Sequence, residues 1–408
     1  MSRYNFCIPS NVSRTQILSD LEDSKLWKVY YFLNLLYEVP VKKQKVYDKY
    51  LINGWVQLHS VLLKKGIGND YKEIIDFLIG KGIVLKREDK KYKVKKYSSS
   101  FGLSEEYSLD VKVVEANVPT KVFNRLKTTR AKGRFEIPYL WKWLYDPKFT
   151  IDISGALQQL INEQLDNKYK ERLLRYKLYS IMNKSFYFTR DTSGKRLHTN
   201  ISHLNKDYKK HLRYDGQKLV EIDIENSQPF FSLLILQKFF GKSLNQLKEL
   251  KGEYNDVPLY ISLVESGLIY EHMDMEYMSS KYEKPTLEFK DMRDKIKNRF
   301  WKVLFSKEES FKGLRKVFSE AFPNVYNAFI PKTKRGLNFA EQLQRAESNI
   351  ILDKVCKNIN REFPECPMYT VHDSILTISE YADDVKAILK AEIFKTIATV
   401  PNLHTKQL

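Results

Sequence analysis

Two aspartates far apart in the chain each follow a short apolar run that alternates like a strand. Asp223 lies within residues 218–229, where apolar and polar residues alternate before a cluster of turn-forming residues. Asp373 lies beside His372 at the expected bend of a hairpin over residues 368–378. A carboxylate at the end of a core strand needs a partner, and a metal ion is a common one. If the two strands converge, these aspartates would supply what two-metal phosphoryl transfer requires.

The turn at residues 193–200 is a further candidate for phosphate or base contacts. It places Gly194 before adjacent basic residues, Arg196 among them, and then His198 and hydroxyl side chains. These groups offer several hydrogen-bond donors to phosphates or base edges. The signal is weak when the turn is taken alone.

Residues 291–307 predict an amphipathic helix that could bind a nucleotide. Two cations and then two aromatic side chains recur every four residues on one stripe: Arg293, Lys297, Trp301 and Phe305. Cations suit a triphosphate, and a flat ring suits stacking under a base. An ordinary surface helix with extended lysine or arginine stems and core aromatics gives the same pattern.

The composition favours a nucleic-acid partner. The 408 residues carry 69 Lys and Arg against 50 Asp and Glu, a formal net charge of +19. Such a charge favours polyanions, with nucleic acid ahead of an anionic membrane surface. No signal peptide or membrane span is indicated, and the three cysteines show no zinc or disulfide spacing. We therefore expect a cytoplasmic, reduced protein of two or three domains, without a membrane partner.

The N-terminal part predicts a small helix and hairpin unit. A helical pattern runs from Ser24 and ends before Pro40, and a second one covers residues 71–79. Strand-like runs follow at 82–87 and 92–97. This order is that of a winged helix, and the segment resembles winged-helix domains of phage and plasmid replication proteins.

For residues 26–110 we predict a winged-helix-like DNA-binding domain that contacts phosphates. Its basic residues are Lys64, Lys65, Lys72, Lys81, Lys86, Arg87, Lys90, Lys91, Lys93, Lys95 and Lys96. The alternative is a small domain with a solvated lysine face, or one that binds protein. Around it we expect a loosely docked arm at 1–25, a linker region at 111–150 and helical structure at 153–183. Residues 398–408 read as a short tail.

The order of the motifs resembles that of family A DNA polymerases and the related single-subunit phage-type RNA polymerases. Residues 194–198 are similar to the family's Thr-Gly-Arg-Leu motif, and Asp223 with the following Ser-Gln is similar to motif A. The stripe at 293–305 matches motif B in spacing, and 372–374 matches motif C. Residues 342–348 resemble the family's Gln-containing helix.

The resemblance, over roughly residues 185–395, implies an α+β fold: a right-hand palm with an antiparallel sheet, helical fingers and a helical thumb. The thumb-like helices would be residues 151–185, and the palm and fingers residues 186–408. It implies a DNA polymerase of a phage or mobile element, acting in a bacterial or phage-infected cell. Template, primer and nucleoside triphosphates would be its partners, together with replication accessory proteins.

The resemblance also implies roles for the site residues. Two Mg²⁺ ions, with Mn²⁺ as the substitute, would be held by Asp223, Asp373 and the carbonyl of Ile224. Lys297 would be the general acid toward pyrophosphate. The nucleotide-binding residues would be Arg293, Lys297, Trp301, Phe305 and Gln228, and the nucleic-acid-binding residues Arg196, His198, His372 and Gln344.

Departures from the family pattern leave alternatives open. The Ser-Gln pair lies four residues after Asp223 instead of two, so Glu225 competes for the first metal position. Motif C ends in Ser374, as in the RNA polymerase branch, so the choice between dNTP and NTP stays open. The rival functions are a primase or RNA polymerase, a non-catalytic replication initiator, and a basic scaffold protein.

Overall fold

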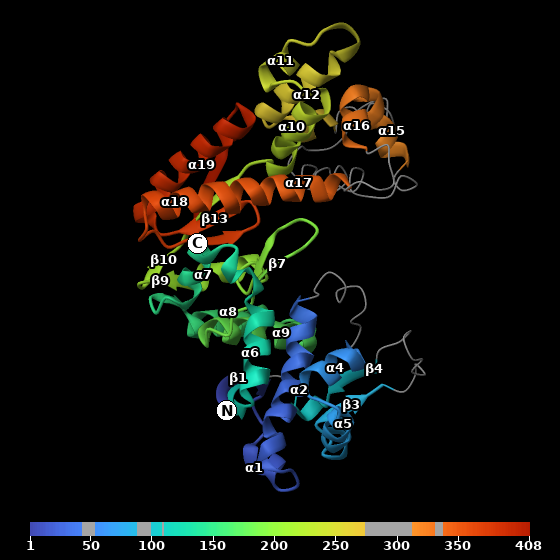
Figure 1. Cartoon of the computed structure of the whole chain (residues 1–408), viewed down its shortest axis with the longest axis vertical. Helices are drawn as coiled ribbons and strands as arrows, with labels where there is room; N and C mark the ends of the chain where they lie inside the picture. The colour runs from blue at the N-terminus through green and yellow to red at the C-terminus, as the bar shows by residue number, and fades with distance from the viewer. Residues whose placement is uncertain (43–53, 88–98, 108–109, 274–311, 331–337) are drawn as a thin grey trace.

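The computed structural model describes residues 1–42, 54–87, 99–107, 110–273, 312–330 and 338–408. Over these residues the protein is α+β with several small antiparallel sheets. Two hydrophobic cores form, one built mainly from residues 6–118 and the other from residues 137–408. They occupy opposite ends of the long axis (Figure 1).

Two strands from opposite ends of the N-terminal unit pair with each other and complete the first core. Strand β1 (Ser2–Pro9) pairs antiparallel with β5 (Val111–Val118) over its full length. Phe6 and Ile8 of β1 are both 0% exposed. The expected arm at 1–25 and linker at 111–150 are therefore wrong, because each contributes a strand to one ladder. Two short helices continue these segments, α1 (Arg14–Leu18) and α6 (Thr120–Arg130).

In the rest of the unit, α2 (Asp23–Lys42) and α5 (Tyr71–Gly80) occupy the two stretches expected to be helical, and β3 (Val84–Lys86) lies within the strand-like run at 82–87. Helix α2 precedes β2 (Val56–Leu58), α4 (Ser60–Gly66), α5, β3 and β4 (Ser99–Leu103). The strands form an antiparallel sheet in the order β2-β4-β3. The strand expected at 92–97, and Lys90, Lys91, Lys93, Lys95 and Lys96 with it, lie outside the described residues.

Helix α2 continues through Pro40 instead of ending before it. Proline costs a helical hydrogen bond, but Val39, Pro40 and Val41 are all buried against the first core. Their apolar contacts offset the lost bond.

Two helices cover residues 153–183, the stretch expected to be helical. Helix α8 (Ile153–Glu163) ends at Gln164, which adopts a left-handed φ of 42°. Helix α9 (Lys168–Met182) begins where Asn167 caps it by accepting from the Tyr169 and Lys170 amides. Tyr176 of α9 stacks on Tyr37 of α2, with ring centroids 5.6 Å apart, so α9 joins the two cores.

The second core surrounds a four-stranded sheet in the order β12-β13-β11-β14. These strands are β12 (Tyr369–Val371), β13 (Ser374–Thr377), β11 (Val220–Ile224) and β14 (Leu403–Gln407). Strand β14 pairs with the whole of β11, from Val220↔Gln407 to Ile224↔Leu403. The C-terminal residues are thus an edge strand, which corrects the expected tail at 398–408.

Shorter strands and helices complete the second core (Figure 1). The strands are β6 (Phe149–Ile151), β9 (Leu212–Tyr214), β10 (Gln217–Lys218), β7 (Phe188–Arg190) and β8 (Leu197–Thr199). The helices are α7 (Pro138–Tyr145), α10 (Ser227–Phe240), α11 (Leu244–Lys248), α12 (Asp256–Glu265), α15 (Lys312–Ala321), α16 (Pro323–Phe329), α17 (Phe339–Ser348), α18 (Cys356–Glu362) and α19 (Ala382–Ile397). A π-helical segment, η5 (Asn349–Val355), joins α17 to α18. Within the described ranges, no helix combines the length and hydropathy needed to cross a membrane.

Candidate functional site

The structure brings Asp223 and Asp373 to the same end of the central sheet. Strands β11 and β13 are neighbours, with Ile222 opposite Ile375 as their last paired residues. Beyond that pair β11 continues to Asp223, and β13 leads back to the bend that carries Asp373. Both aspartates are partly exposed. Their charges act together on two buried groups, Lys209 and Glu347, so the four side chains share one site.

The local fold follows from strand alternation and turn geometry. Val220, Ile222 and Ile224 are buried on one face of β11, and Glu221 and Asp223 emerge on the other. A two-residue bend joins Val371 of β12 to Ser374 of β13. Such bends need a positive φ, and His372 supplies it with a φ of 57°.

A buried cation lies among the carboxylates of this site. Lys209, in the short helix η3 (Lys206–His211), is 6% exposed, and its Nζ lies 3.8 Å from Glu221 Oε1. Burial lowers the pKa of Lys209, while the charges of Glu221, Asp223 and Asp373 act in the opposite direction. Ser374 Oγ also donates to Glu221 Oε1, at 3.1 Å. Glu221 therefore has protein partners, and Lys209 partly offsets the negative charge of the site.

Arg196 and Glu347 form a buried ion pair at the edge of the site. Arg196 Nε and Nη2 donate to the two Glu347 oxygens at 2.9 and 2.6 Å. The side chains are only 15% and 2% exposed. Burial raises the pKa of Glu347 to about 7; Arg196 opposes this rise, and the negative charges of Asp373 and Asp223 add to it. Glu347 thus changes charge near neutral pH.

The loop of the β7–β8 hairpin is organised by Asp191. Its carboxylate accepts hydrogen bonds from the Gly194 amide at 2.6 Å, the Arg196 amide at 3.1 Å and His198 Nε2 at 3.0 Å. Burial acts to raise the pKa of Asp191, but the hydrogen bonds led by that from His198 lower it overall. The loop thereby presents Arg196 and His198 in fixed positions.

The same hairpin is fastened to α17 and η5. Arg190 binds Asp353 through two hydrogen bonds of 2.9 and 2.7 Å. Arg345 Nε donates to the Ser193 carbonyl at 2.6 Å. Gly194 packs directly on Gln344, with no room for a Cβ between them. Three expected nucleic-acid-binding residues, Arg196, His198 and Gln344, therefore lie along the contact between the hairpin and α17, which we call the seam.

His372 lies exposed at the bend, close to the cations of this seam. The pKa of its imidazole is lowered to about 4, with desolvation by the surrounding protein as the largest cause. The charges of Arg196, His198, His203 and Lys209 add to this lowering. The ring is therefore uncharged at neutral pH and can both donate and accept hydrogen bonds.

The remaining predicted residues are placed as follows. Ile224 is buried in β11, Gln228 is partly buried in the first turn of α10, and Glu225 lies exposed beyond the end of β11. The charge of Asp223 acts on both Lys209 and Glu347. Arg293, Lys297, Trp301 and Phe305 lie outside the described residues.

Sequence reasoning missed Lys209, Glu221 and Glu347 as members of the site. Glu347 did leave a signal, because Phe339, Leu343 and Glu347 recur every four residues and so share the buried stripe of α17. An acid in such a stripe needs a cation. The sequence gives no such indication for Lys209, because the neighbouring Lys210 is equally basic and yet exposed.

The donor set at the site suits magnesium. The described ranges contain no group of three or more His, Cys, Asp or Glu side chains placed to enclose a metal ion. Magnesium often takes only one or two protein carboxylates and completes its shell with water and substrate phosphates. Asp223 and Asp373, partly exposed at one sheet end, match that pattern.

Comparisons with solved structures find similar chains, and one of them is described here. The chain is similar to the POL domain of Pol1 from M. smegmatis, solved with DNA primer-template and dNTP, at 11% identity and a TM-score of 0.37. The alignment covers 63% of this chain and 55% of that one, so this chain spans little more than half of that relative. No family model and no curated protein matches the sequence.

Proposed function

We propose that the protein is a template-directed nucleotidyltransferase, a DNA polymerase resembling family A, that adds nucleotides to a primer 3′-hydroxyl. The meeting of Asp223 and Asp373 at one end of the sheet carries this proposal. Both belong to the motifs of the resemblance, although 150 residues separate them in the chain. In this reading the sheet is the palm and helices α8 and α9 are the thumb.

Asp223, Asp373 and the carbonyl of Ile224 would hold Mg²⁺, with Mn²⁺ as a substitute. When bound, the ions would lower the pKa of the 3′-hydroxyl and neutralise the phosphates. Lys209 limits the repulsion between the carboxylates when no substrate is bound, since its ammonium is held among them. Glu221, already engaged by Ser374, is left to position Lys209.

The seam beside the aspartates would hold primer and template. Glu347 fixes the Arg196 guanidinium, and Asp191 fixes the loop around it, so little side-chain freedom is lost on binding. His198 and Gln344 lie along the same seam. The neutral His372 suits a sugar or base edge better than a phosphate.

The resemblance alone supports the remaining roles. Arg293 and Lys297 would bind the triphosphate, with Lys297 as general acid, and Trp301 or Phe305 would pack on the new base pair. Gln228 would contact the nucleotide from α10. The N-terminal unit would be a winged-helix-like DNA-binding domain, and the protein would serve a phage or mobile element with accessory proteins.

Primer extension by the full chain tests this proposal. We expect Asp223→Asn and Asp373→Asn each to lower the rate on the order of 10³-fold, since each removes a carboxylate that would hold a metal ion. Asp383→Asn is the matched control, because that aspartate is 94% exposed on α19. Unchanged extension by the double variant Asp223→Asn/Asp373→Asn would remove the metal-site proposal.

The same assay separates the rival functions. dNTPs and NTPs are offered on single-stranded template, with and without a primer, in Mg²⁺ or Mn²⁺. Chains made from NTPs without a primer would identify a primase or RNA polymerase. Tight template binding without synthesis under any condition would favour a replication initiator.

A further inference from the structure

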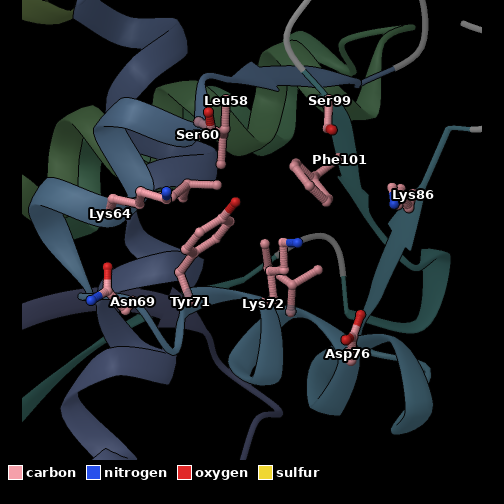
Figure 2. Close-up of a pocket in the computed structure, with 12 residues that line it drawn as sticks. Leu58, Ser60, Lys64, Asn69, Tyr71, Lys72, Asp76, Lys86, Ser99 and Phe101 are labelled. Carbon is pink, nitrogen blue, oxygen red and sulfur yellow. The ribbon is translucent and has the colours of Figure 1, made fainter. Parts of the chain in front are cut away.

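The N-terminal unit contains a second site, far from the two aspartates. A hollow of about 760 Å³ lies between helices α4 and α5 and the sheet of β2, β4 and β3. Figure 2 shows side chains from the helices and the strands converging on it. Leu58, Leu63, Ile75 and Phe101 give it an apolar floor. Its volume is within the range of about 300–1,000 Å³ that small-ligand sites occupy.

The rim of the hollow carries positive charge that the described part of the protein does not neutralise. Lys64, Lys72 and Lys86 line the hollow and are exposed. None of them forms an ion pair with a described residue. Three lysines elsewhere on the unit are paired: Lys25 with Glu73, Lys28 with Asp70 and Lys81 with Asp20. Asp76 is the one acid among the described lining residues, so the hollow has an excess of positive charge and suits an anion.

Two rings lie between these lysines. Figure 2 shows Tyr71 reaching from α5 into the hollow, with its hydroxyl directed away from the helix, and Phe101 beyond it on β4. Phe101 is fixed from behind by Phe32, whose ring meets it edge-on at 5.4 Å. Tyr71 is 9% exposed and Phe101 only 2%. Tyr71 is therefore the ring that a ligand in the hollow would meet, with three lysines on the rim.

We propose that this hollow binds an unpaired nucleotide of a single nucleic-acid strand. The base would lie against Tyr71, and the flanking phosphates would contact Lys64, Lys72 and Lys86. A duplex keeps the faces of its bases stacked, so it can meet the lysines but cannot fill the apolar floor. This goes beyond docking of duplex phosphates on a lysine face, and it does not depend on the catalytic proposal.

Binding of oligonucleotides to the full chain, without divalent ions or nucleotides, tests the charged rim. Anisotropy compares a fluorescent single strand with a duplex of the same sequence. In the variant Lys64→Ala/Lys72→Ala/Lys86→Ala, we expect the slope of log affinity against log salt for the single strand to fall by about 2. The control Lys238→Ala/Lys357→Ala/Lys390→Ala removes the same charge from exposed positions on α10, α18 and α19, the helices around the second core. Equal effects of the two triple variants would overturn the site.

The aromatic surface has its own test. Tyr71→Leu should weaken single-strand binding roughly tenfold, as stacking energies indicate, and leave duplex binding unchanged. Tyr71→Phe keeps the ring and should bind as the wild type does. Equal losses for single strand and duplex would reduce the site to phosphate docking and overturn the proposal.

Cross-linking separates this hollow from any other strand-binding surface. A single strand carrying 5-bromouracil is irradiated on the wild-type protein, and modified peptides are mapped by mass spectrometry. We expect adducts at Tyr71 with the single strand and none with the duplex. Adducts confined to the second core would overturn the proposal, whatever the polymerase assay shows.

Discussion

Replacing Glu347 by glutamine should remove a pH dependence of stability that one buried carboxyl group creates. The pKa of Glu347 is raised from its ordinary 4.5 to about 7, chiefly by burial. The folded protein therefore holds this proton more tightly than the unfolded chain does. Ionisation then lowers the free energy of unfolding as the pH rises from about 4.5 through 7, and a rise of this size corresponds to about 3 kcal/mol. The variant Glu347→Gln would keep the shape of the side chain and lose the titrating proton.

Thermal unfolding between pH 4.5 and pH 8 measures this effect. For a cooperative unit as large as the second core, 1 kcal/mol shifts Tm by about 2 °C. The Tm of Glu347→Gln minus that of the wild type should therefore rise by roughly 6 °C across the range. Glu362→Gln is the control, because that side chain is 47% exposed at the end of α18 and water surrounds it in both states. A Tm difference that stays constant with pH would refute the reasoning.

Two further predictions concern the same site. Gly194→Ala should destabilise the protein by about 1–3 kcal/mol in urea unfolding, since the added methyl would lie 2.8 Å from Gln344 Cβ; Gly80→Ala, with open space around it, should be nearly neutral. Lys209→Met should tighten Mn²⁺ binding at least severalfold in a titration, because it removes a cation that acts on Asp223 and its partner carboxylates. Weaker or unchanged Mn²⁺ binding would contradict a metal role for those carboxylates.

Local sequence patterns predict the elements that carry the site. The alternation around Asp223 indicates the strand β11, and the polar bend at His372 indicates the β12–β13 hairpin. Helix α5 ends at Gly80, as its spacing indicates. Each of these rests on side-chain periodicity or turn chemistry within about ten residues, which a sequence displays directly.

Long-range partners are not visible in the same way. The pairing of β1 with β5 and of β14 with β11 joins segments more than 100 residues apart, and the local patterns at both chain ends indicate no strand. The sequence of a strand does not show which other strand will pair with it. Partner and register are set by which residues are buried on the face of the assembled sheet.

The sequence by itself determined the net positive charge, the alternating strands and the positions of Asp223 and Asp373 at their ends. Only the tertiary structure decided that these ends meet, and that Lys209 and Glu347 lie in their field. The reason is electrostatic: a charge acts through space on whatever folding brings near it, and burial sets how strongly. Neither distance nor burial is a property of the chain until it has folded.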